Sequence, residues 1–276
     1  MSLNSVNTNV GAMIALQKLQ TTSAELAVVQ SRVNTGKKVA SAKDNGAIWA
    51  IAQGQRSEIG ALNAVKDSLL RGQSATDVAI AAGESVSDLL VQLKEKALTA
   101  SDTSLATSSR QALNEDFMAI RDQITTVVSN ATFDGVNLIN NPTTVGFKAL
   151  SNTSGSTTTV NGEHLSLGGA NVALAVTTTI GTAFLASAAL GQVNMSINNV
   201  AAALGRLGTG SNSLSTHLKF VSKLQDALES GVGNLVDADL GKESARLQSL
   251  QTKQQLGVQA LSIANQSPSV LLGLFR

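Results

Sequence analysis

The feature that most constrains the fold of this chain is a heptad ladder of apolar residues between Leu190 and Val232. One track, at intervals of seven residues, consists of Val193, Val200, Leu207, Leu214, Val221 and Leu228, and a second, adjacent track consists of Leu190, Ile197, Leu204, Leu218 and Val232. This spacing places both tracks on one stripe of a single helix, which then needs a helical partner. Such a helix would be roughly 65 Å long, whereas a typical helix has about three turns. The ladder therefore predicts a rod.

Two further segments supply partners for the ladder. Residues 55–98 repeat the heptad pattern, with Gly72 and Gly83 leaving room for a closely packed helix, and residues 113–131 alternate apolar positions by four and three. We predict a mainly α fold, a long antiparallel helical bundle or coiled-coil rod with a small β-hairpin region. Its predicted core joins Leu62, Leu69, Leu90, Leu93, Leu113, Phe117, Ile120 and Ile124 to Val193, Ile197, Val200, Leu204, Leu207, Leu214, Leu218, Val221 and Leu228.

The two ends of the chain carry helical stripes that are less complete. Residues 3–33 and 236–264 have apolar residues at helical spacing, but each stripe is too sparse to stabilise a lone helix. We predict that these terminal helices pair, with Gly231 and Gly233 marking a boundary after the ladder and Pro268 ending the C-terminal helix. The predicted assembly residues are Val6, Val10, Met13, Leu16, Leu19, Leu26, Val33, Leu240, Leu247, Leu250 and Leu261, with Leu271 and Leu274 in an apolar tail.

Composition indicates how such a chain meets its surroundings. Charged residues make up only 14% of the chain and the net charge is +1, so we expect no nucleic-acid partner and no membrane insertion. A polar but uncharged surface is suited to being covered by other protein. There is no cysteine, which excludes disulfides. The N-terminus lacks the features of a secretory signal, which alone would predict a cytoplasmic protein.

The region between the helices differs from them in composition. Asp134-Gly135 is a strong turn signal, and residues 143–180 are rich in Thr, Ser and Gly. The β-branched runs Thr157–Val160 and Val172–Val176 are the predicted strands. We expect hairpins and loops here that pack against the helices.

A search for chemistry finds no catalytic or metal-binding arrangement. His164 and His217 are isolated, and no phosphate-binding loop, nucleophile elbow or HExxH motif is present. Asp237 and Asp239 are interpreted as first-turn helix residues. The basic cluster of Arg32, Lys37, Lys38 and Lys43 is interpreted as solvated or subunit-contacting charge in a connector, because no aromatic platform accompanies it. We predict no enzyme activity, no cofactor and no metal.

Several motifs at both ends of the chain, in the correct order, resemble those of bacterial flagellins. They are Arg32–Gly36 with Ser41–Asp44 and Ala50–Ala52, then Thr132–Gly135, Asp237–Leu240, Glu243–Ala245 and Ala264–Pro268. The likeness covers nearly the whole chain except residues 143–180, so the chain resembles a short form without large outer domains. It departs from the family at Asn45, Gly46, Ile48 and Trp49.

The resemblance implies a structural subunit of the extracellular flagellar filament used for motility, exported by the flagellar secretion system without a cleaved signal peptide. It implies assembly with copies of itself, and as further partners the export apparatus, an export chaperone, the filament cap and the hook-junction proteins. Residues 1–43 and 236–276 would form the inner tube from paired helices and a connector. Residues 44–235 would form an outer helical rod with a β-hairpin and loop insert at 133–180.

The resemblance also leaves alternatives open. Some flagellins carry acidic sugars on hydroxyl groups, for which the candidates here are Ser151, Thr153, Ser154, Thr157, Thr158, Thr159, Thr177, Thr178 and Thr179, although turn and strand chemistry explains these residues equally well. A flagellar hook-filament junction protein would share the paired terminal helices. A chemoreceptor-type signalling coiled coil would share the long heptads, but not the Thr-rich insert or the apolar tail.

Overall fold

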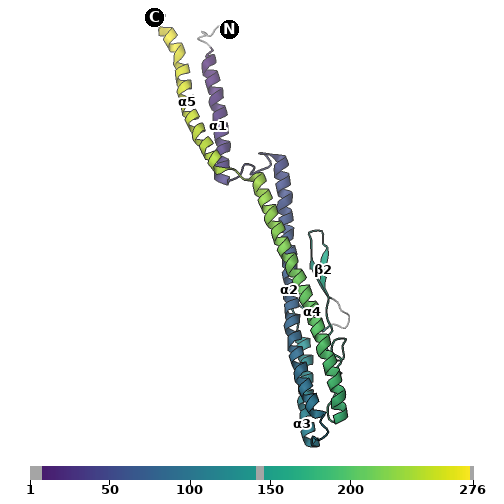
Figure 1. Ribbon diagram of the computed structural model, residues 1–276. Coiled ribbons are helices and arrows are strands. Elements are labelled where there is room, and N and C mark those ends of the chain that lie inside the picture. The colour runs from purple at the N-terminus through teal and green to yellow at the C-terminus, as the bar shows by residue number, and fades with distance from the viewer. Residues whose placement is uncertain (1–7, 141–145, 274–276) are drawn as a thin grey trace. The chain divides into compact units, whose positions relative to one another are not determined.

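The chain is mainly helical, as the ladder predicted. The computed structural model describes residues 8–140 and 146–273 (Figure 1). Within these residues it contains α1 (Val10–Thr35), α2 (Gly46–Ala100), α3 (Thr107–Asn130), β1 (Phe147–Leu150), β2 (Thr157–Val160), α4 (Ala183–Val236) and α5 (Leu240–Gly273). The two strands form one antiparallel hairpin. The predicted combination of long helices and a small β-hairpin is confirmed.

The chain divides into two compact units. Unit 1 consists of residues 1–57 and 227–276, and unit 2 consists of residues 58–226. The long helices α2 and α4 each contribute residues to both units. The domain boundaries predicted from the sequence lie at 43/44 and 235/236, and both positions fall inside unit 1.

Helices α2 and α4 pack antiparallel in unit 2. Gln225 of α4 donates to Asn63 of α2 (Nε2 to Oδ1, 2.9 Å), and Ser211 lies opposite Asp77 farther along (3.4 Å). The close approach that the glycines predicted is present: a Cβ at Gly83 would lie 2.6 Å from a methyl group of Leu204. A side chain at this position would therefore push the two helices apart.

The predicted core residues of α2, α3 and α4 point inward. Buried are Leu62, Leu69, Leu90, Leu93, Phe117, Ile124, Val193, Val200, Leu207, Leu214 and Val221, and half-buried are Leu113, Ile120, Ile197, Leu204, Leu218 and Leu228. Full burial of one such side chain stabilises the fold by about 1.5–3 kcal/mol. All of these residues except Leu228 belong to unit 2, so this unit has an extended apolar seam of its own.

The insert between α3 and α4 is only partly a β structure. Asp134 and Gly135 form a tight turn with positive φ values of 49° and 76°, and Phe147 pairs with Val160 in the hairpin. The prediction of a strand at Val172–Val176 is wrong, because this run is irregular. Its backbone groups are satisfied elsewhere: Ala173 N donates to the Ser196 hydroxyl (3.0 Å) and Leu174 O accepts from Gly168 N (2.8 Å). A hydrogen-bond partner on a helix thus replaces the partner strand.

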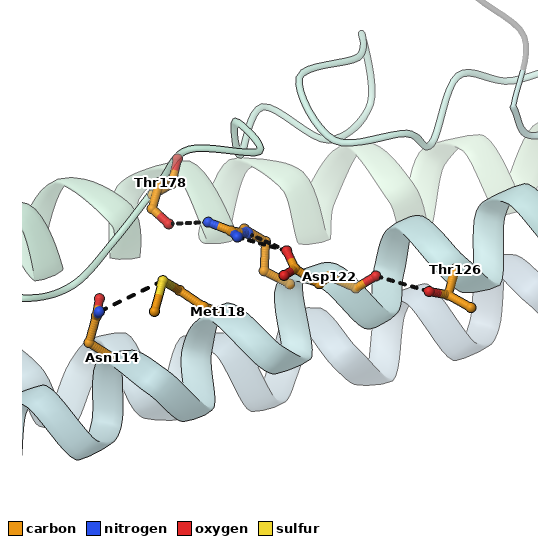
Figure 2. A network of polar contacts seen from close by, with 6 residues as sticks. Asn114, Met118, Asp122, Thr126 and Thr178 are labelled. Atoms are coloured by element: carbon orange, nitrogen blue, oxygen red, sulfur yellow. Dashed lines mark hydrogen bonds and ion pairs between the residues drawn. The ribbon is translucent and has the colours of Figure 1, made fainter.

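Polar side chains of α3 hold the end of the insert in place. Arg121, which is buried, donates through Nη1 to the backbone oxygen of Thr178 (3.0 Å) and pairs with Asp122 (2.7 Å). Asn114 accepts a hydrogen bond from Ile180 N (2.7 Å). Figure 2 shows Thr178 above this face of α3, with Asn114 and Asp122 on the helix below it. The insert is therefore part of the unit 2 core, since these bonds fix its backbone against the helix.

Two predicted helix boundaries are wrong. Helix α4 continues through Gly231 and Gly233 to Val236, because a glycine inside a helix costs only about 1 kcal/mol. The helix ends where Ala238 N donates instead to Gly36 O of the connector (2.9 Å). Helix α5 continues through Pro268 to Gly273. Proline removes one intrahelical hydrogen bond there without ending the helix.

Candidate functional site: the paired terminal helices

Helices α1 and α5 form an antiparallel pair in unit 1 (Figure 1). Arg32 near the end of α1 meets Glu243 near the start of α5 (3.2 Å), and Gln254 donates to Ser23 farther along (3.4 Å). At the other end of the pair, Asn9 donates through Nδ2 to Ala264 O (2.7 Å). The contacts span the described length of α1. The predicted pairing of the N- and C-terminal helices is confirmed.

Asn9 and Gly257 explain how the two helices approach each other. The Asn9 side chain caps α1 by accepting from Ala12 N (3.0 Å), so one residue both begins the helix and binds its partner. At Gly257 an added Cβ would lie 3.2 Å from a methyl group of Leu19. The glycine therefore sets a close helix–helix distance at this point of the pair.

The connector after α1 folds onto the segment between α4 and α5. Gly36 ends α1 in the left-handed region (φ 68°), which glycine adopts without strain. Lys37 then pairs with Asp237 in an isolated bridge, and Lys38 N donates to Val236 O (2.8 Å). The interpretation of Lys43 as solvated or subunit-contacting connector charge stays a prediction. Lys38 has a structural partner, because its ammonium group donates to Asn234 O at the end of α4 (2.8 Å).

Asp44 organises the turn that precedes α2. One of its carboxylate oxygens accepts from Ala40 N (3.0 Å) and Ser41 N (2.9 Å). The hydrogen bond from the Ser41 backbone is the main cause that lowers the pKa of Asp44, and the Ser41 hydroxyl, Ala40 N and Arg32 lower it further. The charged carboxylate is thus the form that holds the turn.

The Arg32–Glu243 pair places a charge between α1 and α5. Glu243 is 9% exposed, and its Oε2 has no hydrogen-bond partner within the described residues. The two residues are 211 positions apart, so no local spacing in the sequence signals that they pair. Arg32 was predicted to be connector charge, and the structure instead places it on a buried carboxylate.

The predicted assembly residues of unit 1 differ widely in burial. Leu250 is buried; Leu19, Leu26, Val33, Leu247 and Leu261 are half-buried; Val10, Met13, Leu16 and Leu240 are exposed. Val6 and Leu274 lie outside the described residues, as does the side chain of Leu271. The pair therefore buries one edge of each stripe and leaves the rest open.

Sequence reasoning missed several apolar residues of this unit. Val29 is the buried residue of α1, and its spacing of three from Leu26 and four from Val33 would have revealed it. Further large apolar residues are exposed on both helices: Ile14, Val28, Leu256, Val258 and Ile263. Each of these lies off the predicted stripe. Within the described residues, the apolar surface of the pair thus extends beyond the stripe that the sequence indicated.

The hydroxyl residues of the insert lie in two settings. Exposed are Thr153, Ser154, Thr157, Thr159 and Thr177, and half-buried are Ser151, Thr158, Thr178 and Thr179. Among the exposed group, Thr153 donates to Glu58 of α2 (2.6 Å). Ser154 N is bound by the Asn152 side chain in a tight turn (3.1 Å).

The described residues contain no group of three or more His, Asp or Glu side chains that could hold a metal ion. His217 has a structural contact, because its Nε2 lies 2.6 Å from the backbone oxygen of Ser151. Over the same residues, we find no helix with the length and apolar character needed to span a membrane.

Comparison with known proteins gives matches over most of the chain. Residues 6–144 match the bacterial flagellin N-terminal helical region, and residues 190–275 match the bacterial flagellin C-terminal helical region. Flagellins FljM and FljK of Caulobacter vibrioides are each 58% identical over 276 residues, covering 100% of both chains. A flagellin of Brucella melitensis is 36% identical and covers 99% of each chain.

Among solved structures, a protein described as flagellar hook-associated, from Vibrio parahaemolyticus, superposes with a TM-score of 0.56. The match covers 70% of this chain and 100% of that one, at 15% identity. At this identity the likeness shows the fold alone.

Proposed function

Because the chain belongs to the bacterial flagellin family, the structural subunits of the flagellar filament, we propose that it joins that filament through the apolar surfaces of its paired terminal helices. It is a short form, since it matches relatives of its own length end to end. The segments 1–43 and 236–276 would line the inner tube and 44–235 would form the outer part. The filament role is structural, with no cofactor.

The observation that carries this proposal is the exposure of the α1–α5 pair. Met13 is 62% exposed, Leu256 58% and Ile263 70%, although all three are large apolar residues. Large apolar residues exposed together on one helix pair indicate an interaction site. Copies of the same chain supply a cover of matching character, because each brings the same pair of incomplete stripes.

The energetics favour coupled folding and assembly. An ordered backbone residue costs about 1–2 kcal/mol in conformational entropy, and an isolated α1 or α5 buries too little surface to offset that cost. Assembly would bury Met13, Leu16 and their neighbours, each contributing about 1.5–3 kcal/mol when fully covered. The terminal helices would then be stable in the polymer and marginal in the free subunit.

Seeded polymerisation followed by electron microscopy tests the proposal. Purified chain is added to sheared filament fragments, and elongation of the fragments into long helical filaments is the expected result. Sedimentation of the same sample as a discrete dimer, with no elongation, would instead favour the signalling coiled coil. A null strain whose filaments remain but detach at the hook would favour the junction protein.

The route to the filament is also part of the proposal. We expect the chain to be extracellular, exported through the flagellar secretion system with the help of an export chaperone, and added beneath the filament cap beyond the hook-junction proteins. A strain with an inactive export apparatus should retain the chain inside the cell. Appearance of the chain in the medium of that strain would contradict this route.

Sugars on the insert are a second, separate proposal. Ser154, Thr157, Thr159 and Thr177 combine a hydroxyl group with an exposed position, which attachment by a transferase requires. Ser151, Thr158, Thr178 and Thr179 are less accessible, and Thr153 is engaged by Glu58. Intact-mass spectrometry of native filaments should show added mass that maps to the exposed group. A mass equal to that of the unmodified chain would dispose of the proposal.

A further inference from the structure

The outward face of α4 in unit 2 carries a line of exposed residues. Phe184, Met195, Ala202, Ser213 and Phe220 are separated alternately by 11 and 7 residues, so they lie on one side of the helix. All five are exposed, and we call them the outer stripe. The exposure of the three large members is 81% for Phe184, 57% for Met195 and 58% for Phe220.

The outer stripe has few charged neighbours between Phe184 and Ser213, whereas two exposed lysines, Lys219 and Lys223, flank Phe220. From Ala183 to Leu218 the one residue with a formal charge at neutral pH is Arg206. Glu163 binds its guanidinium through two contacts of 2.7 Å, so this charge is neutralised by the insert. The exposed residues of α2 in the same unit include Asp77, Glu84 and Asp88. Between Phe184 and Ser213 the α4 face therefore has the character of a surface that protein covers.

The stripe holds a projecting ring at one end and a hollow near the other. Phe184 near the start of α4 is the projecting residue. A shallow, open hollow of about 500 Å³ lies beside Phe220, between α4 and β2, and is lined also by Thr158, Ser213, Thr216 and His217. Phe184 and Phe220 are 36 residues apart on one helix, a separation of roughly 54 Å. The ring and the hollow of one chain therefore cannot meet each other.

We propose that Phe184 of one copy of this chain enters the hollow beside Phe220 of a second copy. The contact joins two different patches, so it is head-to-tail: each copy still offers one free ring and one free hollow. Such contacts continue into an open polymer rather than closing into a dimer. The inference rests on the proposed filament function and adds to it a lateral contact of unit 2, separate from the terminal helices.

Crosslinking tests this contact directly, because the chain contains no cysteine. A double variant, Phe184→Cys with Ser213→Cys, is assembled on seeds and treated with a short bis-maleimide. The two thiols of one chain are 29 residues apart along α4, roughly 44 Å, so the reagent can link only different copies. We expect a ladder of dimers, trimers and longer species on a denaturing gel, at least tenfold stronger than with the control, Leu185→Cys with Ser213→Cys.

A charge substitution provides a second measurement that does not depend on thiol geometry. Ser213→Glu places a carboxylate in the hollow, whereas Ala201→Glu places one on an exposed site of the same helix outside the stripe. We expect the critical concentration for polymerisation to rise about tenfold or more for the first and less than about twofold for the second. Circular dichroism should show both variants folded.

The outcomes separate this inference from the proposed function. Filaments of the double-cysteine variant without a ladder, or equal critical concentrations for the two glutamate variants, would overturn the contact and leave the filament role intact. Linked dimers from Phe184→Cys alone would show a symmetric contact and would also overturn it. Failure of the unaltered chain to elongate seeds would count against the filament function itself.

Discussion

Unit 2 and unit 1 use the same kind of apolar helical pattern but complete it differently. In unit 2, Leu90, Phe117 and Val200 are each 0% exposed, and every predicted core residue there is buried or half-buried. In unit 1, Met13 and Leu240 are 62% and 50% exposed, and among the predicted residues whose side chains the structure describes only Leu250 is buried. The difference shows that the helices of unit 2 cover one another, whereas unit 1 leaves large apolar residues exposed.

The largest expected effect comes from removing one side of the incomplete seam. Deletion of residues 237–276 takes away α5 and leaves α1 with no helical partner, so polymerisation should be abolished. Unit 2 keeps its contacts, and its cooperative thermal transition by circular dichroism should persist. Normal filaments from this truncated chain would break the comparison, because unit 1 would then be dispensable for assembly.

A matched pair of alanine substitutions separates folding from assembly. Leu90→Ala opens a cavity in the unit 2 core and should lower the free energy of unfolding by about 2–5 kcal/mol. Met13→Ala removes an exposed side chain and should change monomer stability by less than about 0.5 kcal/mol. The order should reverse in assembly, where Met13→Ala raises the critical concentration. Chemical denaturation and seeded polymerisation measure the two quantities. Equal monomer destabilisation by both variants would contradict the distinction.

The ion pairs of the two units offer a smaller test. Arg206 of unit 2 binds the buried carboxylate of Glu163 at 2.7 Å, whereas Arg246 of unit 1 reaches Glu25 at 3.8 Å with both side chains about half exposed. Arg206→Gln removes the ion-pair partner of the buried Glu163 carboxylate, and we expect the free energy of unfolding to fall by about 1–2 kcal/mol. Arg246→Gln should cost less than about 0.5 kcal/mol.

Urea unfolding of the monomer measures both variants. The Arg206→Gln loss should shrink when Glu163→Gln is introduced as well, because the buried carboxylate that needs a partner is then gone. Additive losses in the double variant would show that the two side chains do not act through each other.

Sequence reasoning succeeded where burial is periodic and failed where it depends on distant contacts. The heptads of α2 and α4 identified Leu69 and Leu214 as inward-facing because one period recurs over many turns. The irregular run at Val172 looked like a strand, since β-branched residues suit any half-buried extended chain, and nothing local reveals that Ser196 supplies its hydrogen bond. The sequence did not reveal the Arg32–Glu243 pair either, because its two residues are far apart in the chain.

In the candidate site, the sequence predicted the apolar stripe of α1 but not how exposed its residues are. Exposure at Met13 depends on which face α1 turns toward α5, and this orientation is set by close approach at Gly257 and by the Asn9–Ala264 hydrogen bond. The local spacing of apolar residues predicts which residues form a stripe. It does not predict which helix covers that stripe.

The smallest expected effect concerns the connector of unit 1. Hydrogen bonds from Ser41 hold the folded-state pKa of Asp44 below its ordinary value of 3.8. A lowered pKa means that the charged carboxylate contributes stability above the ordinary value, and that this contribution is lost as the pH falls through the folded pKa. Asp44→Asn should therefore remove a small acid-dependent step from filament dissociation below about pH 4.

Asp102 of unit 2 is the control, because Ser104 lowers its pKa in the same way at a turn of the unit that supplies its own core. Asp102→Asn should leave filament dissociation by acid unchanged, and an equal shift from both variants would show that the connector of unit 1 has no special part in assembly.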